Sequence, residues 1–251
     1  MKNIGLIVLA VVGIATVEAK AQTADDVVNN YLIGIGGADK WASVKTLRML
    51  GKIKMQSVEV PVTIVQGAGG RMKISTFMNG TEFVQMAFDG TIAWSTNAVT
   101  KIPEKMSEED TYNLQQDAIA DFPDPFLNYR NRGYEVQVEG TEKLENVDHV
   151  KVKLIKKPQK VNNVMVENSV YYYMNPINSV PFLSQITLQK GPIRGIMQEI
   201  MYRNYQNVEG ILFPFEMNYR MNGQPGQTIL IEKININPKL EDKEFAFPAI
   251  K

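Results

Sequence analysis

Side chains that commonly carry catalysis or bind metals are scarce in this chain. Its 251 residues include one histidine, His149, and no cysteine. Such a chain lacks the cysteine–histidine pairs of thiol hydrolases and every metal site built from thiolates or several imidazoles. His149 follows Asp148 where an alternating segment begins, which is typical of an ordinary residue at the end of a strand. We therefore expect no catalytic residue, no metal and no cofactor.

Carboxylates remain as possible catalytic groups, because a pair of them can hydrolyse a glycosidic bond without histidine. The candidates are Glu108, Glu109, Asp110, Asp121 and Asp124. The first three follow Ser107 directly, and acidic residues after a serine are typical of the first turn of a helix. A carboxylate hydrolase is thus an alternative that requires two of these side chains to converge in one cleft.

The N-terminal residues predict export from the cytoplasm. Residues 1–21 combine Lys2, an apolar stretch and a small-x-small pattern that ends at Ala21, as in a cleavable secretory signal peptide. We therefore expect a periplasmic protein with no stable membrane span after cleavage. The formal net charge of zero argues against a nucleic-acid-binding protein.

Residues 22–251 show no linker or repeat and are expected to form a single domain. Two long helices and one short helix are expected. The first begins at Thr23, which forms a capping-box pattern with Asp26, and continues through an apolar stripe that includes Tyr31 and Leu32. Residues 38–44 predict a short helix after it. The other long helix is expected over Ser107 to Asp121 and must end at the two prolines of FPDPF.

Most of the remaining chain alternates apolar and polar residues, as strands of an antiparallel sheet with one buried face do. We expect roughly ten strands in up-and-down order, a number set by the turn signals between alternating segments. Those signals include Asn79-Gly80, Asp89-Gly90, Glu209-Gly210 and Asn222-Gly223. Leu50 and Gly51 interrupt the alternation of the first strand.

A sheet of this size must bury its apolar face, and the two helices look too short to cover it alone. The segment NVEGILFPFEMNY places apolar residues at every odd position from Ile211 to Tyr219. Its Pro214, like Pro61 in another strand, is expected at an edge or bulge of the sheet. An incompletely closed barrel fits these prolines better than a seamless one, although bulges in a closed barrel would also explain them.

Three stretches resemble the LolA/LolB-like group of periplasmic lipoprotein carriers, including relatives described as outer membrane lipoprotein-sorting proteins. They are IGGADKW leading into KTLRMLGKIKM, then FDGTIAW, and YQNVEGILFPFEMNY followed by QTILIEKININP. The resemblance spans most of residues 22–251. It implies a mainly β fold with a few helices, a curved and incompletely closed antiparallel β half-barrel covered by helices, whose apolar concave face receives acyl chains.

One turn departs from that group. Its best-known carriers have a Lys-Arg-Pro turn whose arginine helps to hold a lid, whereas the corresponding stretch here, QGAGGRMKI, has Ala68 and Gly69 at those positions. Arg71 lies nearby at a position that does not match. The role of that arginine is therefore not transferred to this chain.

Strand positions of apolar parity supply the predicted ligand-binding residues. These are Met49, Ile53, Met55, Val62, Ile64, Met72, Ile74, Trp94, Phe213, Phe215 and Met217. The predicted lid residues are Tyr31, Leu32, Tyr112, Ile119 and Phe122. The methionines suit a surface that accepts variable apolar ligands and equally suit gaps in an ordinary core; both interpretations stay open.

The favoured hypothesis is a non-enzymatic periplasmic carrier that holds the acyl chains of lipoproteins or lipids for transfer toward the outer membrane. Its partners would be those acyl chains and possible membrane-bound donor and acceptor proteins. The alternative is a non-catalytic envelope interaction module with the same fold and a filled cavity.

Overall fold

The computed structural model describes residues 22–78 and 80–249. The predicted signal peptide lies outside the described residues. The helices are α1 (Ala24–Gly34), α2 (Ala38–Ser43) and α3 (Glu108–Asp121), with short 3-10 turns η1 (Ala68–Gly70), η2 (Gly191–Ile193) and η3 (Asp242–Glu244). The strands are β1 (Thr46–Met55), β2 (Val58–Gly67), β3 (Met72–Met78), β4 (Thr81–Phe88), β5 (Ala93–Thr96), β6 (Pro103–Lys105), β7 (Glu135–Leu144), β8 (Val147–Val161), β9 (Val164–Met174), β10 (Pro181–Thr187), β11 (Met197–Val208), β12 (Ile211–Met221) and β13 (Gln224–Ile236).

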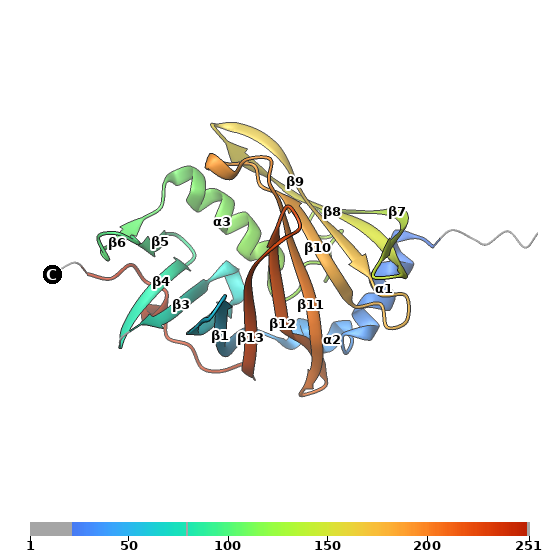
Figure 1. The fold of residues 1–251 in the computed structure, drawn as a ribbon, viewed down its shortest axis with the longest axis horizontal. Helices are drawn as coiled ribbons and strands as arrows, with labels where there is room; N and C mark the ends of the chain where they lie inside the picture. Colours follow the sequence, from blue (N-terminus) through green and yellow to red (C-terminus); the bar gives the residue numbers. More distant parts are fainter. Residues whose placement is uncertain (1–21, 79, 250–251) are drawn as a thin grey trace, which may run out of the picture.

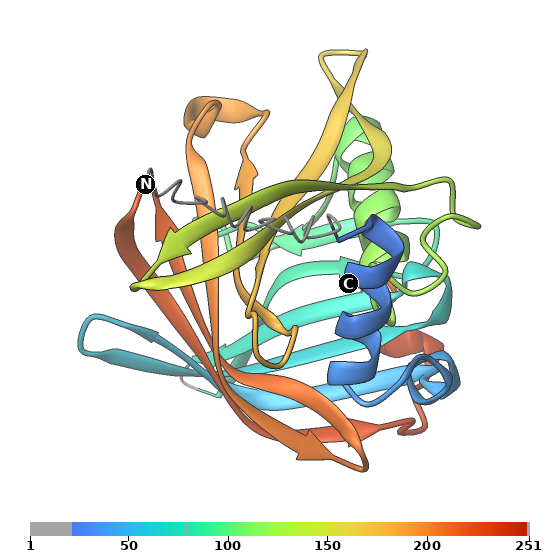
Figure 2. The same ribbon diagram turned by 90° about the vertical axis from the view of Figure 1, so that its right-hand side faces the viewer.

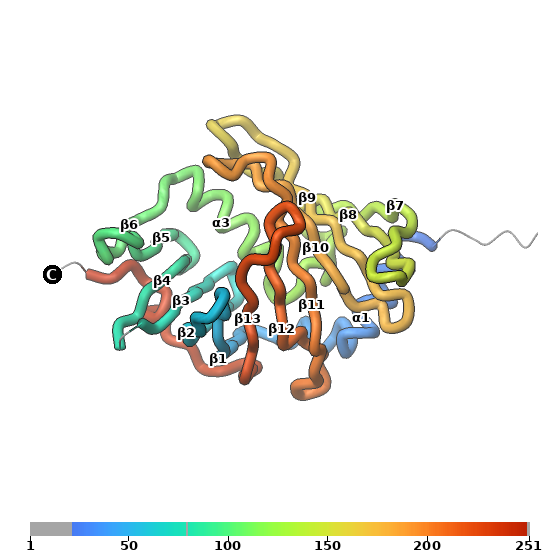
Figure 3. Tube along the Cα trace, in the orientation of Figure 1, coloured from blue at the N-terminus to red at the C-terminus, as the bar shows by residue number. Residues whose placement is uncertain are grey.

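All thirteen described strands form one antiparallel sheet. Their order is β6-β5-β4-β3-β2-β1-β13-β12-β11-β10-β9-β8-β7, so β6 and β7 are the two edges and the sheet does not close into a barrel. The first and last strands of the chain are neighbours at its centre (Figure 1; the trace is followed in Figure 3). Figure 2 shows the sheet curling around α1 and α3. The predicted open half-barrel with a few helices is confirmed, with more strands than the roughly ten expected.

Helix α1 begins as the sequence predicts. The Thr23 side chain accepts a hydrogen bond from the backbone N–H of Asp26, and the Asp26 carboxylate accepts one from the Thr23 backbone N–H in return. Its apolar stripe, which includes Val28 and Tyr31, is buried in the main core. Within the described residues, no helix is both long enough and apolar enough to cross a membrane.

Helix α3 links the two ends of the open sheet. It begins after the capping residue Ser107 and ends at Asp121, directly before the segment FPDPF. It contacts β8 near one end of the sheet and β4 and β5 near the other. The helix therefore lies across the opening that an unclosed sheet leaves.

The two prolines mark places where neighbouring strands part. β12 pairs with β13 from Glu216 to Met221, whereas Pro214 lies before that range and pairs with β11 alone. Pro61 lies just before Val62, where the pairing of β2 with β3 begins. In both cases the missing N–H of proline leaves no ladder bond unmade on the open side. Each proline thus lies where one of the two neighbouring ladders is absent, although β2 and β12 are themselves interior strands of the sheet.

Cross-strand pairing also shows which residues lie on the outer face. One row runs across β1 to β5 and consists of Arg48, Val65, Lys73, Ala87 and Trp94. The chain after β13 packs over this row, because Glu244 pairs with Arg48 at 2.6 Å and the Phe245 carbonyl accepts a hydrogen bond from the Trp94 indole at 2.8 Å. The C-terminal segment thus covers the outer face of β1 to β5 and leaves the concave face to the helices.

Candidate functional site

A cavity of about 720 Å³ lies between α3 and strands β8 to β11. Two smaller hollows, of about 330 and 320 Å³, lie beside α3. Ligand pockets in proteins commonly have volumes of about 300 to 1,000 Å³, so the first cavity has the size of a binding site for a small molecule or part of a larger one.

The cavity exists because β9 and β10 diverge. β10 pairs with β9 only over Tyr171 to Met174, so residues 164–170 of β9 have no partner on that side within the described chain. β10 instead runs into the loop 188–196, and Figure 2 shows the β8–β9 hairpin and the β10–β11 loop separating. Residues from both diverging segments, including Val166 and Leu188, line the cavity. The divergence leaves a slot between the strands, which α3 flanks.

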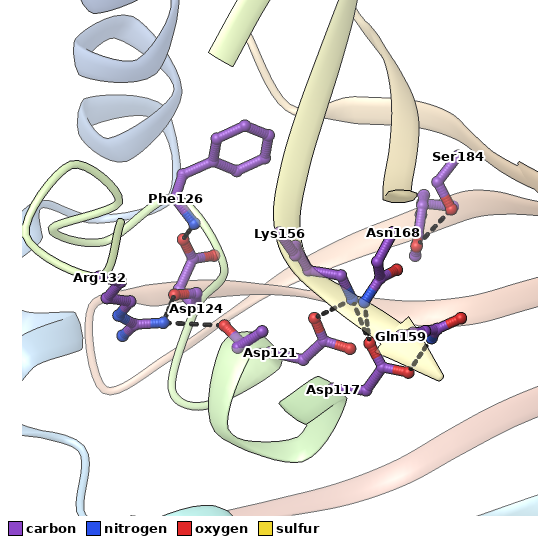
Figure 4. Close-up of polar contacts among 11 residues, drawn as sticks. Asp117, Asp121, Asp124, Phe126, Arg132, Lys156, Gln159, Asn168 and Ser184 are labelled. Carbon is purple, nitrogen blue, oxygen red and sulfur yellow. Dashed lines mark hydrogen bonds and ion pairs between the residues drawn. The ribbon is translucent and has the colours of Figure 1, made fainter. Parts of the chain in front are cut away.

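One wall of the cavity carries an ion-pair cluster (Figure 4). Lys156, on β8, donates to Asp117 at 2.9 Å and to Asp121 at 3.2 Å, both on α3. Its side chain is 5% exposed, whereas Asp121 keeps 50% of its side-chain surface accessible. Because Asp121 lines the cavity, that carboxylate is surrounded by protein and still open to an occupant.

Amide and hydroxyl groups extend the polar wall. The Asp117 carboxylate accepts hydrogen bonds from Gln159 at 2.8 Å and from Asn168 at 2.9 Å. On the next strands, the hydroxyls of Ser184 and Tyr202 lie 2.9 Å apart. No buried side-chain nitrogen or oxygen of the described residues lacks a hydrogen-bond partner, so the polar wall is satisfied without an occupant.

The charges of the cluster follow from burial and proximity. Burial opposes the charge of Lys156, but Asp121 and Asp117 outweigh it and hold the pKa of Lys156 above its ordinary value. Burial also raises the pKa of Asp121, although Lys156 opposes the shift. The pKa of the Tyr202 phenol is raised by burial as well, so Tyr202 is a neutral hydroxyl. The wall therefore presents one cation that two carboxylates already neutralise.

Aliphatic side chains lie among these polar groups in the lining. They are Val166 and Val170 of β9 together with Ile186, Leu188 and Ile200 from the β10 and β11 side. Such side chains offer apolar area to a hydrocarbon group but no hydrogen bonds. The arrangement as a whole can accommodate a molecule that is apolar on one side and polar on the other.

Polar contacts hold the N-terminal half of α3 against the sheet. The Asn113 amide bonds the backbone of Lys160 twice, accepting from its N–H and donating to its carbonyl at 2.7 Å each. Lys190 pairs with Glu109 and Asp110 at 2.6 Å each. The helix buries only Ala118 and Ala120. Its attachment therefore depends on hydrogen bonds and charges far more than on apolar packing.

A second buried cluster fixes the loop after α3. The Tyr31 hydroxyl of α1 donates a short hydrogen bond to Asp124, and Asp124 also accepts from the backbone N–H of Phe126 at 2.9 Å. Burial raises the pKa of Asp124 to about 6, although these hydrogen bonds oppose the shift. The Arg132 guanidinium donates to the carbonyls of Ala120 and Asp124. This cluster connects α1 with the C-terminal end of α3.

The residues predicted to line a ligand cavity lie elsewhere on the concave side. Ile53, Val62, Phe213 and Phe215 are buried in the main core, and Met49, Ile64, Ile74 and Met217 are partly buried against it. Phe213 packs on the Trp41 ring of α2 at 5.0 Å between centroids. None of these side chains lines the 720 Å³ cavity. Helices α1 and α2 fill this part of the concavity.

The three other predicted binding residues are dispersed. Met55 is 46% exposed at a strand end, and Met72 is half-buried at the start of β3. Trp94 lies on the outer face under the C-terminal segment, packed with Val84 and Ala87. Trp94 is thus a buried structural aromatic in contact with chain after β13 and does not line the 720 Å³ cavity.

The predicted lid residues divide between the two helices. Tyr31 and Leu32 are buried on α1. Ile119, on α3, is 40% exposed and lines the 320 Å³ hollow together with Phe122, while Tyr112 lines the 330 Å³ hollow. Arg71, next to the turn that departs from the LolA/LolB-like pattern, makes an ion pair with Asp242 of the C-terminal segment at 2.6 Å.

The sequence prediction missed the polar wall, although the alternation of β8 contains its signal. Val152 and Leu154 face the interior, and Lys156 continues the same parity. The neighbouring positions are Asn168, paired with Lys156 across the ladder, and Ser184, paired with Tyr172. A lysine, an asparagine and a serine on the buried parity of adjacent strands therefore indicate a polar patch inside the sheet.

The five candidate catalytic carboxylates do not converge in one cleft. Glu109 and Asp110 bind Lys190 at the start of α3, Asp121 lines the 720 Å³ cavity and Asp124 is buried under Tyr31. Glu108 lines the 330 Å³ hollow. Among the described residues no group of three or more His, Cys, Asp or Glu side chains is placed to hold a metal ion.

Comparison with known proteins adds information on the fold. No protein-family model and no curated protein sequence matches the chain. Three solved structures each cover 89% of this chain and 97% of their own. They are a LolA superfamily protein from Nitrosomonas europaea (14% identity, TM-score 0.54), an outer membrane lipoprotein-sorting protein domain from Vibrio parahaemolyticus (10%, 0.53) and a DUF1329 family protein from Desulfovibrio piger (10%, 0.56). The predicted resemblance is confirmed at the level of architecture: this chain has a LolA-like fold.

Proposed function

We propose that this protein is an envelope binding protein that carries an acyl-bearing molecule, a lipid or a lipoprotein, in the cavity between α3 and strands β8 to β11. The proposal includes export by residues 1–21, a single domain over residues 22–251, a periplasmic location and delivery toward the outer membrane. Membrane-bound donor and acceptor proteins would complete the route. No covalent step is required.

The observation that carries the proposal is the 720 Å³ cavity beside a helix that packs weakly. Protein interiors are normally close-packed. If the concave side of this sheet served only as a hydrophobic core, a cavity of this volume would not be expected. The LolA-like fold supports the same function, because two of the similar structures are named for LolA and for lipoprotein sorting.

The energetics favour capture and make release the controlled step. Burial of hydrocarbon contributes about 0.8 kcal/mol per CH₂, so a chain of about 16 carbons would gain roughly 12 kcal/mol before ordering costs. Such a ligand leaves only if an acceptor offers comparable burial or if a competing state of the protein displaces it. α3 is the better lid candidate, since its polar contacts break in water at lower cost than the buried apolar face of α1.

The test begins with the protein purified from its native envelope. Native mass spectra and organic extracts should contain a co-purifying lipid, and the delipidated protein should bind the neutral probe N-phenyl-1-naphthylamine. In Ile186→Trp a large side chain occupies the cavity and should abolish both signals. Ile177→Trp is the matched control, because Ile177 is 90% exposed on a distant turn and should change neither.

Absence of both lipid and probe binding from the unmodified protein would refute the carrier. The packed region around Phe213 and Trp41 would then favour the second candidate function, an envelope interaction module that binds another protein through its surface. A hydrolase is the weakest candidate, because the five carboxylates that the sequence suggested do not converge, and the two that share the cavity, Asp117 and Asp121, are both paired with Lys156.

A further inference from the structure

The charged side chains that line the 720 Å³ cavity are Asp117, Asp121, Lys156 and Glu167. Lys156 is the one cation among these described residues, and it is shared by Asp117 and Asp121. Glu167 pairs with Lys153 at 2.8 Å. The cluster of Asp117, Asp121 and Lys156 therefore carries a net charge of −1 when all three groups are ionised.

One oxygen of this cluster remains open to an occupant. Lys156 bonds Oδ1 of Asp121, and no hydrogen bond among the described residues uses Oδ2. The half-accessible side chain lines the cavity near the C-terminal end of α3 (Figure 4). A carboxylate oxygen accepts hydrogen bonds and donates none when ionised. Its natural partner is an N–H or O–H group of the ligand.

An anionic head of a ligand would find no unpaired positive charge among the described residues that line the cavity. The ammonium of Lys156 already donates to two carboxylates and is 5% exposed. A phosphate or carboxylate in the cavity would lie beside Asp121 without an available cation, and like charges repel strongly where the surroundings are poorly solvated. The Asn168 amide already donates to Asp117, and the Ser184 and Tyr202 hydroxyls bond each other.

We propose that the cavity selects amphiphiles whose head donates hydrogen bonds and carries no negative charge, such as a glyceryl or a protonated amine head, and excludes those with an anionic head. This inference rests on the proposed function, because it names the class of ligand that the same cavity accepts. The head lies at Asp121, and the hydrocarbon lies against Ile186, Leu188 and Ile200.

The test compares ligands with the same dodecyl chain and different heads. Monododecanoylglycerol, dodecylamine, dodecanoate and dodecyl phosphate each displace N-phenyl-1-naphthylamine from the delipidated full-length mature protein at pH 7, below their micelle concentrations. The first two should bind at least about tenfold tighter than the last two. Asp121→Asn, which keeps the shape of the side chain and removes its charge, should weaken dodecylamine by about tenfold and bring dodecanoate closer to it. Asp148→Asn, at an exposed position outside the cavity, is the matched control and should preserve the ranking.

The outcomes separate this inference from the function on which it rests. If dodecanoate or dodecyl phosphate binds as tightly as the amine and the glyceride, the carrier proposal stands and the head selection is wrong. The same holds if Asp121→Asn and Asp148→Asn give equal affinities for all four ligands. If the protein binds neither the probe nor any of the four compounds, the carrier proposal is wrong, and so is this inference, which depends on it.

Discussion

The buried carboxyl of Asp124 connects α1 to the loop after α3 and makes the stability of the protein depend on pH. Asp124 is 4% exposed, and burial raises its pKa from 3.8 to about 6 in the folded protein. In the unfolded chain the carboxyl titrates near its ordinary value. The folded state therefore binds this proton more tightly, so the contribution of Asp124 to stability is fully present below about pH 4 and is lost as pH rises toward 6.

The magnitude follows from the size of the shift. At 1.36 kcal/mol per pKa unit, the loss at high pH is about 3 kcal/mol, of which about 2.4 kcal/mol develops between pH 4 and pH 7. Asp124→Asn cannot ionise and keeps an oxygen that accepts from Phe126. The free energy of unfolding of the variant, minus that of the unmodified protein, should therefore increase by about 2 kcal/mol over this range.

Urea unfolding at pH 4, 5, 6 and 7, followed by circular dichroism, measures this difference, and subtraction of the two proteins cancels the other titrating groups. Tyr31→Phe provides an independent check, because its hydroxyl lowers the pKa of Asp124 and its removal should move the transition to higher pH. A difference that stays constant within about 0.5 kcal/mol, or one that changes in the opposite direction, would show that hydrogen bonds outweigh burial at Asp124 and would refute the reasoning.

Three further substitutions test other parts of the structure. Lys156→Met leaves Asp117 and Asp121 without their cation. Because both carboxylates keep part of their surface in contact with solvent, the free energy of unfolding should fall by about 1 to 3 kcal/mol at pH 8, and by less at pH 5, where protonation of Asp121 is favoured by its raised pKa; an equal loss at both pH values would contradict the ion-pair account. Gly51→Ala places a Cβ 2.1 Å from a carbonyl oxygen of β13 and should strongly reduce the melting temperature, whereas an unchanged value would show that the two strands can separate. Phe213→Ala should lower the free energy of unfolding in urea by about 3 to 5 kcal/mol without weakening the binding of N-phenyl-1-naphthylamine. A selective loss of probe binding would instead indicate that Phe213 belongs to the ligand site.

Local signals predicted the frame of the fold because short-range chemistry determines them. The pairing of Thr23 with Asp26 placed the start of α1, and Ser107 placed that of α3. The interruption at Leu50 and Gly51 corresponds to a shift of register between β1 and β13. In each case the residues that carry the signal lie within a few positions of the structure they specify.

The cavity could not be predicted in the same way, because it arises from relations between distant segments. The divergence of β9 and β10 depends on where two ladders stop pairing. The filling of the other half of the concavity depends on Trp41 reaching Phe213. A lysine side chain is normally exposed to solvent. Lys156 can be buried because it is paired with two carboxylates on α3, some 35 to 39 positions earlier in the chain.

The unpaired edge of β9 has a consequence for the behaviour of the protein during ligand exchange. Residues 164–170 present backbone groups toward β10 without a strand partner, and an exposed edge of this kind can pair with another polypeptide. α3 contacts this part of β9 through Asp117, which accepts a hydrogen bond from Asn168. Movement of α3 away from the sheet would uncover a template for intermolecular β-pairing at the moment the cavity is open. In the proposed carrier, self-association as well as ligand release would therefore limit the time spent open, and exchange in direct contact with a donor or acceptor would be favoured.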